Sequence, residues 1–457
     1  MSHPPHLSLS FLRVALVGFT IAILLPHRAH AVPSYARQAG MSCISCHTEF
    51  PILTEQGRQF KLMGYTQSSD ESKLPPFAVM VQPSFTQTNK NQAGGAAPHF
   101  GENSNFAFTQ ASLFYNGRLF GPYAECVFGK SVATFLNKFG TFFQLTFDGV
   151  ARQLHADNLE LRYADSGTIF GQPITYGFYG NNNPGLQDPW NTSPAWTFPF
   201  TSSGLAPTPG PGTLIEGALA QQVVGVGGYL MLSHSIYVDV AGYHTLDTSF
   251  QKAMGIGIED ETQIPGIAPY WRVAYTKAVG NQTFEVGLSG LHADTYPGRD
   301  NSAGEDHIDD LGADAQYQTS FGKSDVTALA TVYREGQHWR ASQQLGNTTN
   351  RSDHLWSTKV AVDYLYDKTY GAAAGYFVLD GSHDPLLYPD TPNGSPLSDG
   401  VVLQVNYLPF NKSGGPAFWP RSSVKLSVQY VIYDHFNGTT TDASDNNTLY
   451  IESWLAF

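Results

Sequence analysis

The sequence predicts an all-β fold: an antiparallel outer-membrane β-barrel of about 16 strands, preceded by a small α-helical domain. Three observations predict it. From Phe77 onward, apolar and polar residues alternate with a period of two, as in DNLELRYAD at 157–165. From the sixth predicted strand on, the connections alternate between tight turns and long polar loops, and the chain ends in Phe457. Because a soluble β-sandwich explains neither the unequal connections nor the terminal aromatic residue, we prefer the barrel.

The composition is typical of a β-rich chain that meets lipid. Charged residues make up 14% of the chain, against about 25% in average globular proteins, and aromatic residues make up 13%. The formal net charge is −13. Nucleic acid is therefore not expected as a partner, because binding to phosphates needs basic surfaces.

Residues 1–31 have the pattern of a secretory signal peptide. Arg13 precedes an apolar run from Val14 to Leu25, and Ala29-His30-Ala31 supplies the small residues of a cleavage site. The run is too short to cross a bilayer as a helix. We expect an exported chain that begins at Val32 and has no helical anchor.

The segment MSCISCHTEF, residues 41–50, contains two of the three cysteines of the chain, with His47 directly after the second. This Cys-x-x-Cys-His spacing is the attachment motif of c-type haem. Cys43 and Cys46 would bind the two vinyl groups of one haem covalently, and His47 would be the proximal ligand of its iron. A disulfide or a thioredoxin-like redox pair is the alternative, but no βαβ pattern surrounds the motif. Zinc would need two further ligands, and no second cysteine pair exists.

A short helix is predicted after the motif. Thr54 can cap its first turn, Glu55 suits its positive end, and Gly64 can end it in a left-handed turn. Phe60 and Met63 lie three residues apart and share one face, so Met63 is the candidate for the sixth iron ligand. Packing in the core explains Met63 equally well, and Met41 or a histidine from elsewhere in the chain is a rival.

The predicted helical domain, residues 32–75, is at the lower size limit for independent folding, so we expect it to need a wall to pack against. A barrel of about 16 strands encloses an aqueous lumen wide enough for a small folded plug, and we expect the helical domain to occupy it. The barrel domain covers residues 76–457. Its strands are predicted near 77–87, 106–118, 139–148, 157–165, 172–180, 219–232, 235–245, 268–278, 281–292, 310–320, 323–335, 357–367, 370–380, 399–409, 422–434 and 446–457.

Two segments interrupt the strand pattern. Residues 119–138 are too long for a turn and include Cys126, the third cysteine, so we expect an inserted loop there. Residues 181–200, NNNPGLQDPWNTSPAWTFPF, are rich in proline and tryptophan, which indicates an ordered loop. It is either a constriction inside the barrel mouth or an Ω-loop on the surface, and the surface position is slightly favoured.

The segment VPSYARQAGMSCISCHTEFPILTEQGRQFKLMGY resembles the N-terminal part of the outer-membrane cytochrome–porin fusions of iron-oxidising bacteria. The resemblance is dense over residues 32–66, weaker over NNNPGLQDPW, and only architectural over the rest of the chain. It implies a monohaem cytochrome seated in a barrel of the bacterial outer membrane, with Cys43, Cys46 and His47 as its haem residues. The insert at 119–138 departs from the expected pattern.

The same resemblance implies a function. Electrons would pass from extracellular Fe(II) through one haem c to periplasmic carriers such as soluble cytochromes or copper proteins, which is the activity of an electron-transfer oxidoreductase. Two alternatives stay open: outward electron transfer to extracellular acceptors, and a porin that the haem plug gates or senses. Outer-membrane lipid is an expected partner. Porins often associate as trimers, so a homotrimer is a possible assembly, although a filled lumen does not require one.

Overall fold

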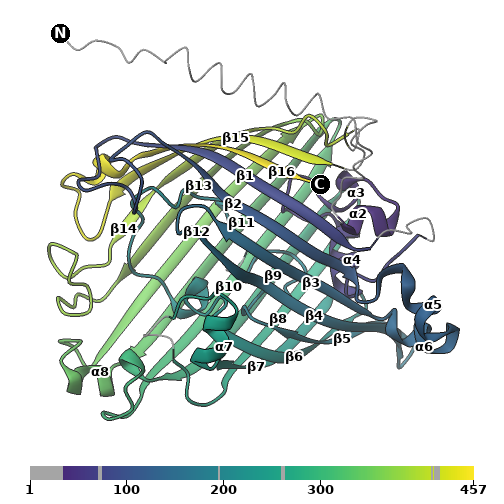
Figure 1. Ribbon diagram of the computed structural model, residues 1–457, viewed down its shortest axis with the longest axis horizontal. Coiled ribbons are helices and arrows are strands. Elements are labelled where there is room, and N and C mark those ends of the chain that lie inside the picture. Colours follow the sequence, from purple (N-terminus) through teal and green to yellow (C-terminus); the bar gives the residue numbers. More distant parts are fainter. Residues whose placement is uncertain (1–33, 70–74, 194–195, 259–262, 413–414, 416–421) are drawn as a thin grey trace, which may run out of the picture.

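In the computed structural model, the described residues are 34–69, 75–193, 196–258, 263–412, 415 and 422–457. The predicted signal peptide, residues 1–31, lies outside them. Figure 1 shows the chain as a tilted ring of long strands with three short helices of the N-terminal segment at one end.

The strands form one closed antiparallel barrel of 16 strands in which each strand pairs with its neighbours in sequence. The first and last strands close the ring, with Met80 opposite Ala456 and Thr88 opposite Thr448. The strands are β1 (Phe77–Thr88), β2 (Asn105–Arg118), β3 (Phe139–Asp148), β4 (Gln153–Ile169), β5 (Gln172–Asn181), β6 (Val223–Leu232), β7 (Ile236–Thr245), β8 (Ala268–Val279), β9 (Gln282–Thr295), β10 (Asp306–Phe321), β11 (Ser324–His338), β12 (Ser352–Tyr366), β13 (Tyr370–Gly381), β14 (Ser398–Tyr407), β15 (Ser423–His435) and β16 (Thr448–Ala456).

The predicted fold class is confirmed, and each of the 16 predicted strands overlaps an observed one. Differences concentrate at the end of the barrel that carries the long loops, which we call the long-loop end. There β10 begins at Asp306 rather than 310, and β12 begins at Ser352 rather than 357. The outward residues on these extensions are polar, including His307 and His354. Backbone pairing therefore continues past the point where the apolar alternation stops.

The two faces of the barrel wall have opposite polarity. Outward positions carry exposed aliphatic side chains in the middle of the wall and tyrosines near the end with the tight turns, the short-turn end. On β12 the outward apolar stretch runs from Trp356 to Tyr366, and about 10 residues at ~3.3 Å each and a tilt of ~40° span about 25 Å. The lumen face is lined by buried polar and charged side chains, among them Thr86, Glu160, Arg162, Asp239, Arg272 and Glu285.

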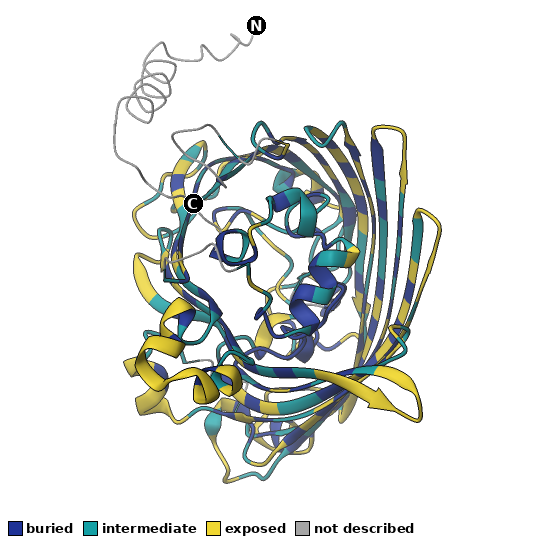
Figure 2. Cartoon of the chain, turned by 90° about the vertical axis from the view of Figure 1, so that its right-hand side faces the viewer, coloured by how far each residue is buried: buried dark blue, intermediate teal, exposed yellow. Residues whose placement is uncertain are grey.

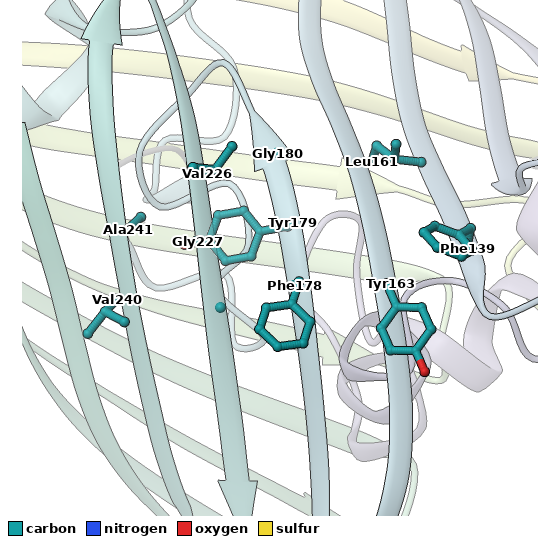
Figure 3. Close-up of a pocket in the computed structure, with 11 residues that line it drawn as sticks. Phe139, Leu161, Tyr163, Phe178, Tyr179, Gly180, Val226, Gly227, Val240 and Ala241 are labelled. Carbon is teal, nitrogen blue, oxygen red and sulfur yellow. The ribbon is translucent and has the colours of Figure 1, made fainter. Parts of the chain in front are cut away.

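Figure 3 shows part of the outward face across β3 to β7. Phe178, Val226 and Val240 project outward around a shallow apolar hollow of about 700 Å³. Gly180 and Gly227 also line it, so the wall carries little side-chain bulk there. The hollow lies on the outside of the barrel, on the opposite side of the wall from the Cys-x-x-Cys-His motif.

The N-terminal helices α2 (Ser34–Ala39), α3 (Cys43–Cys46) and α4 (Glu55–Leu62) lie within the ring of strands (Figure 2). Polar contacts to the wall hold this N-terminal plug, residues 34–69. Arg58 Nη1 donates to Gln318 Oε1 at 2.6 Å, and Lys425 Nζ pairs with Glu49 Oε1 at 3.0 Å. No helix among the described residues is long and apolar enough to cross a membrane.

The helix predicted after the motif is confirmed as α4. Thr54 is its N-cap, and the hydroxyl Oγ1 accepts from the backbone N–H of Gly57 at 3.2 Å. Gly64 adopts the left-handed conformation with φ of 63° directly after the helix. Capping residues thus set both ends of α4, as the sequence predicts.

The long connection between β5 and β6 enters the lumen. Asp188 is fully buried and accepts backbone N–H groups of Trp190, Thr192 and Ser193 at 2.8–3.1 Å. Its Oδ1 also lies 3.5 Å from Arg272 Nη2 on the inner wall. The surface position favoured for residues 181–200 is therefore wrong over the described part of this loop, because the polar lumen satisfies its groups.

The insert between β2 and β3 forms two short helices, α5 (Ala124–Phe128) and α6 (Lys130–Leu136), beside the end of the barrel that holds the plug (Figure 1). The ring of Phe135 packs against Phe139 and Tyr163 at 5.3 and 6.1 Å. Five large apolar side chains of the insert are exposed, namely Tyr123, Val127, Phe128, Val132 and Phe135.

Candidate functional site

Local backbone geometry brings the motif and α4 together. The N–H of His47 donates to the Cys43 carbonyl at 2.9 Å, so α3 is a single turn that ends at the histidine. The N–H of Thr54 donates to the Cys46 carbonyl at 2.9 Å and starts α4 against that turn. A Cβ on Gly57 would lie 2.2 Å from the Cys46 carbonyl oxygen, so this approach requires glycine.

Cys43, Cys46 and His47 all line one cavity of about 620 Å³ inside the barrel. The cavity lies between the plug, the inner wall of the barrel and the loop from Trp196 to Ser202. Its volume is within the roughly 300–1,000 Å³ of pockets that enclose small molecules and cofactors.

The end of the cavity near the motif is aromatic. The ring of Phe50 lies 4.6 Å from His47 and 4.9 Å from Trp454 on the last strand. Further apolar walls come from the plug, from the barrel and from the 196–202 loop, including Leu53, Phe60, Met80, Phe114, Phe142 and Phe198. A flat apolar ring would contact apolar surface on several sides here.

The residues present fit a covalently held haem. His47 Nδ1 is buried and has no hydrogen-bond partner among the residues that the structure describes. Burial lowers the pKa of His47 to about 4, although the nearby carbonyls of Ile52 and Pro51 oppose the shift. The imidazole is therefore neutral, which is the form that ligates metals.

The two thiols do not have the character of a redox pair. Burial raises the pKa of Cys43 and that of Cys46 to about 11, whereas reactive cysteines of redox motifs have lowered pKa values. Both thiols are free rather than joined in a disulfide. Two neutral thiols and a neutral imidazole thus line one cavity, and haem attachment stays a prediction.

The structure separates the two methionines considered as the sixth ligand. Phe60 lines the cavity, but Met63, the C-cap of α4, is not among the lining residues. Met41 does line the cavity and packs against Phe60 and Tyr65. Ligation of the iron by Met63 stays a prediction. Of the two methionines, Met41 is the one that lines the cavity.

Several residues of the site carry no local signal in the sequence. Trp454 lies more than 400 residues from the motif along the chain, and Phe198 belongs to the loop that was assigned to the surface. Gly57 could have been noticed only as a glycine inside a predicted helix. These residues join the site because the barrel closes around the plug.

A buried ion pair supports the plug beside the cavity. Arg162 Nη2 lies 2.7 Å from Glu160 Oε1, and neither side chain is exposed to solvent. Arg162 Nη1 also donates to the carbonyl of Lys61 at 2.8 Å, and its guanidinium lies 5.1 Å from the ring centroid of Tyr65. The pair thus joins the inner wall to the C-terminal end of α4.

No protein-family model matches the chain, and no curated protein matches it. Among solved structures, the outer-membrane channel DcaP of Acinetobacter baumannii is 9% identical with a TM-score of 0.46, covering 83% of this chain and 96% of that one. An anion-selective porin from Comamonas acidovorans is 11% identical with a TM-score of 0.43, covering 83% of this chain and 98% of that one. The trimer form of OmpT of Vibrio cholerae is 9% identical with a TM-score of 0.41, over 83% and 98%. These likenesses concern the porin-like barrel alone.

Proposed function

We propose that the chain is an electron conduit of the bacterial outer membrane. Electrons would pass from extracellular Fe(II) through one covalent haem c to periplasmic carriers such as soluble cytochromes or copper proteins. The observation that carries the proposal is that Cys43, Cys46 and His47 open together into an aromatic cavity inside a closed barrel. A haem c bound there supplies one-electron redox chemistry.

The residues of the chain have separate roles in this proposal. The sulfur atoms of Cys43 and Cys46 hold the group, and His47 presents a neutral ring nitrogen to its iron. The aromatic walls near the motif keep that end of the cavity apolar and exclude water from it. Each Fe(II) gives up one electron and leaves as Fe(III), and a periplasmic carrier takes up the electron.

The outward face of the barrel supports a position in the outer membrane. Its apolar stretch of about 25 Å matches the lipid-facing band of outer-membrane barrels. The insert helices α5 and α6 extend this surface at the short-turn end, since Phe135 packs on outward residues of β3 and β4. Outer-membrane lipid is therefore the proposed environment, and the homotrimer stays a prediction.

A porin gated by the plug is the second candidate. The closed porin-like barrel is consistent with it, and the packing of the lumen opposes movement of the plug. Arg58 and Lys425 tie the plug to the wall by buried contacts. Lys61 Nζ donates to Asn191 Oδ1 and ties the plug to the inner loop. The loop from 183 to 193 adds buried contacts to Arg272. A gate that moved the plug would have to break several of these contacts at once. Breaking the Lys425–Glu49 pair would leave uncompensated buried charges.

The direct test of the conduit uses visible spectra of the haem-loaded chain in vesicles under anaerobic conditions. Addition of Fe(II) is expected to produce the reduced c-type spectrum promptly. If the spectrum stays oxidised while dithionite reduces the same sample, Fe(II) is not the donor. Outward electron transfer predicts instead that extracellular acceptors reoxidise a sample reduced from inside the vesicle.

The proposed contact of the insert with lipid can be tested with a fluorophore attached to Cys126, which is exposed on α5. A polarity-sensitive fluorophore on Cys126 is expected to shift its emission to shorter wavelength in vesicles, because Val127 and Phe128 would enter the lipid interface. Lipids with a nitroxide near the headgroup are expected to quench it. Emission typical of water, with no quenching, would show that the insert faces the aqueous phase.

A further inference from the structure

The cavity has a second end whose chemistry differs from that of the aromatic end. Gln110 on β2, Gln144 on β3 and Asp157 on β4 line it from the inner wall, together with Ser202 of the inner loop. Three charged side chains line the cavity among the described residues: Lys61, Lys359 and Asp157. Asp157 is thus the one carboxylate there.

The carboxylate of Asp157 is held by neutral donors. Its Oδ2 accepts from Thr146 Oγ1 at 2.9 Å and from Gln110 Nε2 at 3.2 Å, and its Oδ1 accepts from Gln221 Nε2 at 3.1 Å. Within the described part of the chain no lysine or arginine forms an ion pair with it, whereas Glu160 is paired with Arg162. His155, two residues before Asp157 on β4, interacts with this carboxylate electrostatically. The side chain is partly buried and lines the cavity, and no lysine or arginine of the described residues forms an ion pair with it.

The positively and negatively charged side chains that line the cavity suit different ligands. A haem has two carboxylate propionates, which the ammonium group of Lys61 suits and which Asp157 would repel. Lys359 is already paired with Glu216 Oε1 at 2.9 Å. Asp157 is therefore unsuited to holding the haem and suited to a cation. Carboxylate, amide and hydroxyl oxygens are hard donors of the kind that bind small divalent cations.

The end of the cavity that contains Asp157, which we call the polar end, lies toward the long-loop end of the barrel. Asp157 is four residues from Gln153, where β4 begins at the long-loop end. A separate hollow of about 500 Å³ opens at that end, lined by Thr109, Asp148 and Gly204 among others. Thr109 is the neighbour of Gln110 in β2, so the outer surface and the polar end of the cavity are close.

We infer that Asp157, with Gln110 and Gln144 beside it, is the docking site for the hydrated ferrous ion. The inference rests on the proposed function, because it names the place where that function takes its substrate. The carboxylate would attract Fe²⁺ to the polar end, and a haem c held by Cys43, Cys46 and His47 would supply the acceptor for one electron from each ion. The resulting Fe³⁺ leaves toward the long-loop end.

Asp157→Asn removes the charge and keeps the shape of the side chain. At a pH at which the carboxyl group of Asp157 is ionised, the second-order rate constant for haem reduction by Fe(II) is expected to be about 10-fold or more lower in Asp157→Asn than in the wild-type chain. Reduction by ascorbate, an anion, is expected to keep its rate or become faster. Asp157→Glu retains the charge and is expected to keep most of the Fe(II) rate.

The matched control is Asp390→Asn, which removes the same charge from an exposed residue of an outer loop and is expected to change nothing. A second readout needs no electron transfer: Mn²⁺ binding followed by electron paramagnetic resonance. The wild-type chain is expected to bind Mn²⁺, and Asp157→Asn is expected to bind it about 10-fold more weakly or worse.

The outcomes separate the docking site from the function on which it rests. Wild-type reduction by Fe(II) in Asp157→Asn, or no Mn²⁺ binding by the wild-type chain, would overturn the docking site. Mn²⁺ binding that depends on Asp157, combined with no reduction of wild-type haem by Fe(II), would leave a cation site standing and remove the proposed function.

Discussion

The double substitution Cys43→Ser/Cys46→Ser is expected to abolish covalently bound haem in the exported chain. A thioether forms only from the sulfur atom of cysteine, and the serine hydroxyl does not replace it. Both cysteines line the same cavity, so the loss of both removes every covalent attachment that this site offers. The measurement is the intact mass of the purified chain, with haem staining after denaturing electrophoresis.

Cys126→Ser is the matched control for this experiment. Cys126 is exposed on the insert, away from the cavity, and its substitution is expected to leave the haem content unchanged. A wild-type chain without a porphyrin adduct would end the haem proposal outright. A double variant that keeps the adduct would show that the attachment lies elsewhere in the chain.

Arg162→Met is expected to lower the free energy of unfolding by about 3–5 kcal/mol, because it leaves the carboxylate of Glu160 buried and unpaired. Neither side chain of this pair is exposed to solvent. The substitution also removes the donor to the Lys61 carbonyl and the cation above the ring of Tyr65. The plug is therefore expected to loosen together with the barrel wall.

Urea-induced unfolding in detergent micelles, followed by tryptophan fluorescence, measures the effect of Arg162→Met. The double variant Glu160→Gln/Arg162→Met is the control, since no unpaired charge remains and most of the lost stability should return. A loss below about 1 kcal/mol in the single variant would mean that water reaches the pair and screens it.

Local patterns were sufficient for much of the fold. The period of two along DNLELRYAD and similar segments reports which residues face out and which face in, so the strands could be placed without tertiary information. Thr54 and Gly64 act on their own helix, so its limits could be placed as well. Strand ends were missed where polar residues such as His307 and His354 replaced the apolar alternation while pairing continued.

The candidate site also has residues that the sequence predicts and residues that only the structure shows. The spacing of Cys43, Cys46 and His47 is a property of five consecutive residues and can be recognised in the sequence. Two aspects could not be predicted there: the loop around Asp188 enters the lumen, and Met41 rather than Met63 lines the cavity. The position of this loop and the position of Met41 both depend on which residues of the closed barrel wall lie next to them.

By itself the sequence determined the strand alternation, the capped helix and the Cys-x-x-Cys-His spacing, because each depends on neighbours within one turn or one strand. Tertiary structure alone decided which chain segments meet in the lumen. Barrel closure brings Trp454, Phe198 and Asp157 around one cavity, and no pattern along the chain encodes such distant pairings. The physical reason is that buried polar and aromatic groups contact whatever lies near them in the folded chain, and this proximity does not depend on their separation along the sequence.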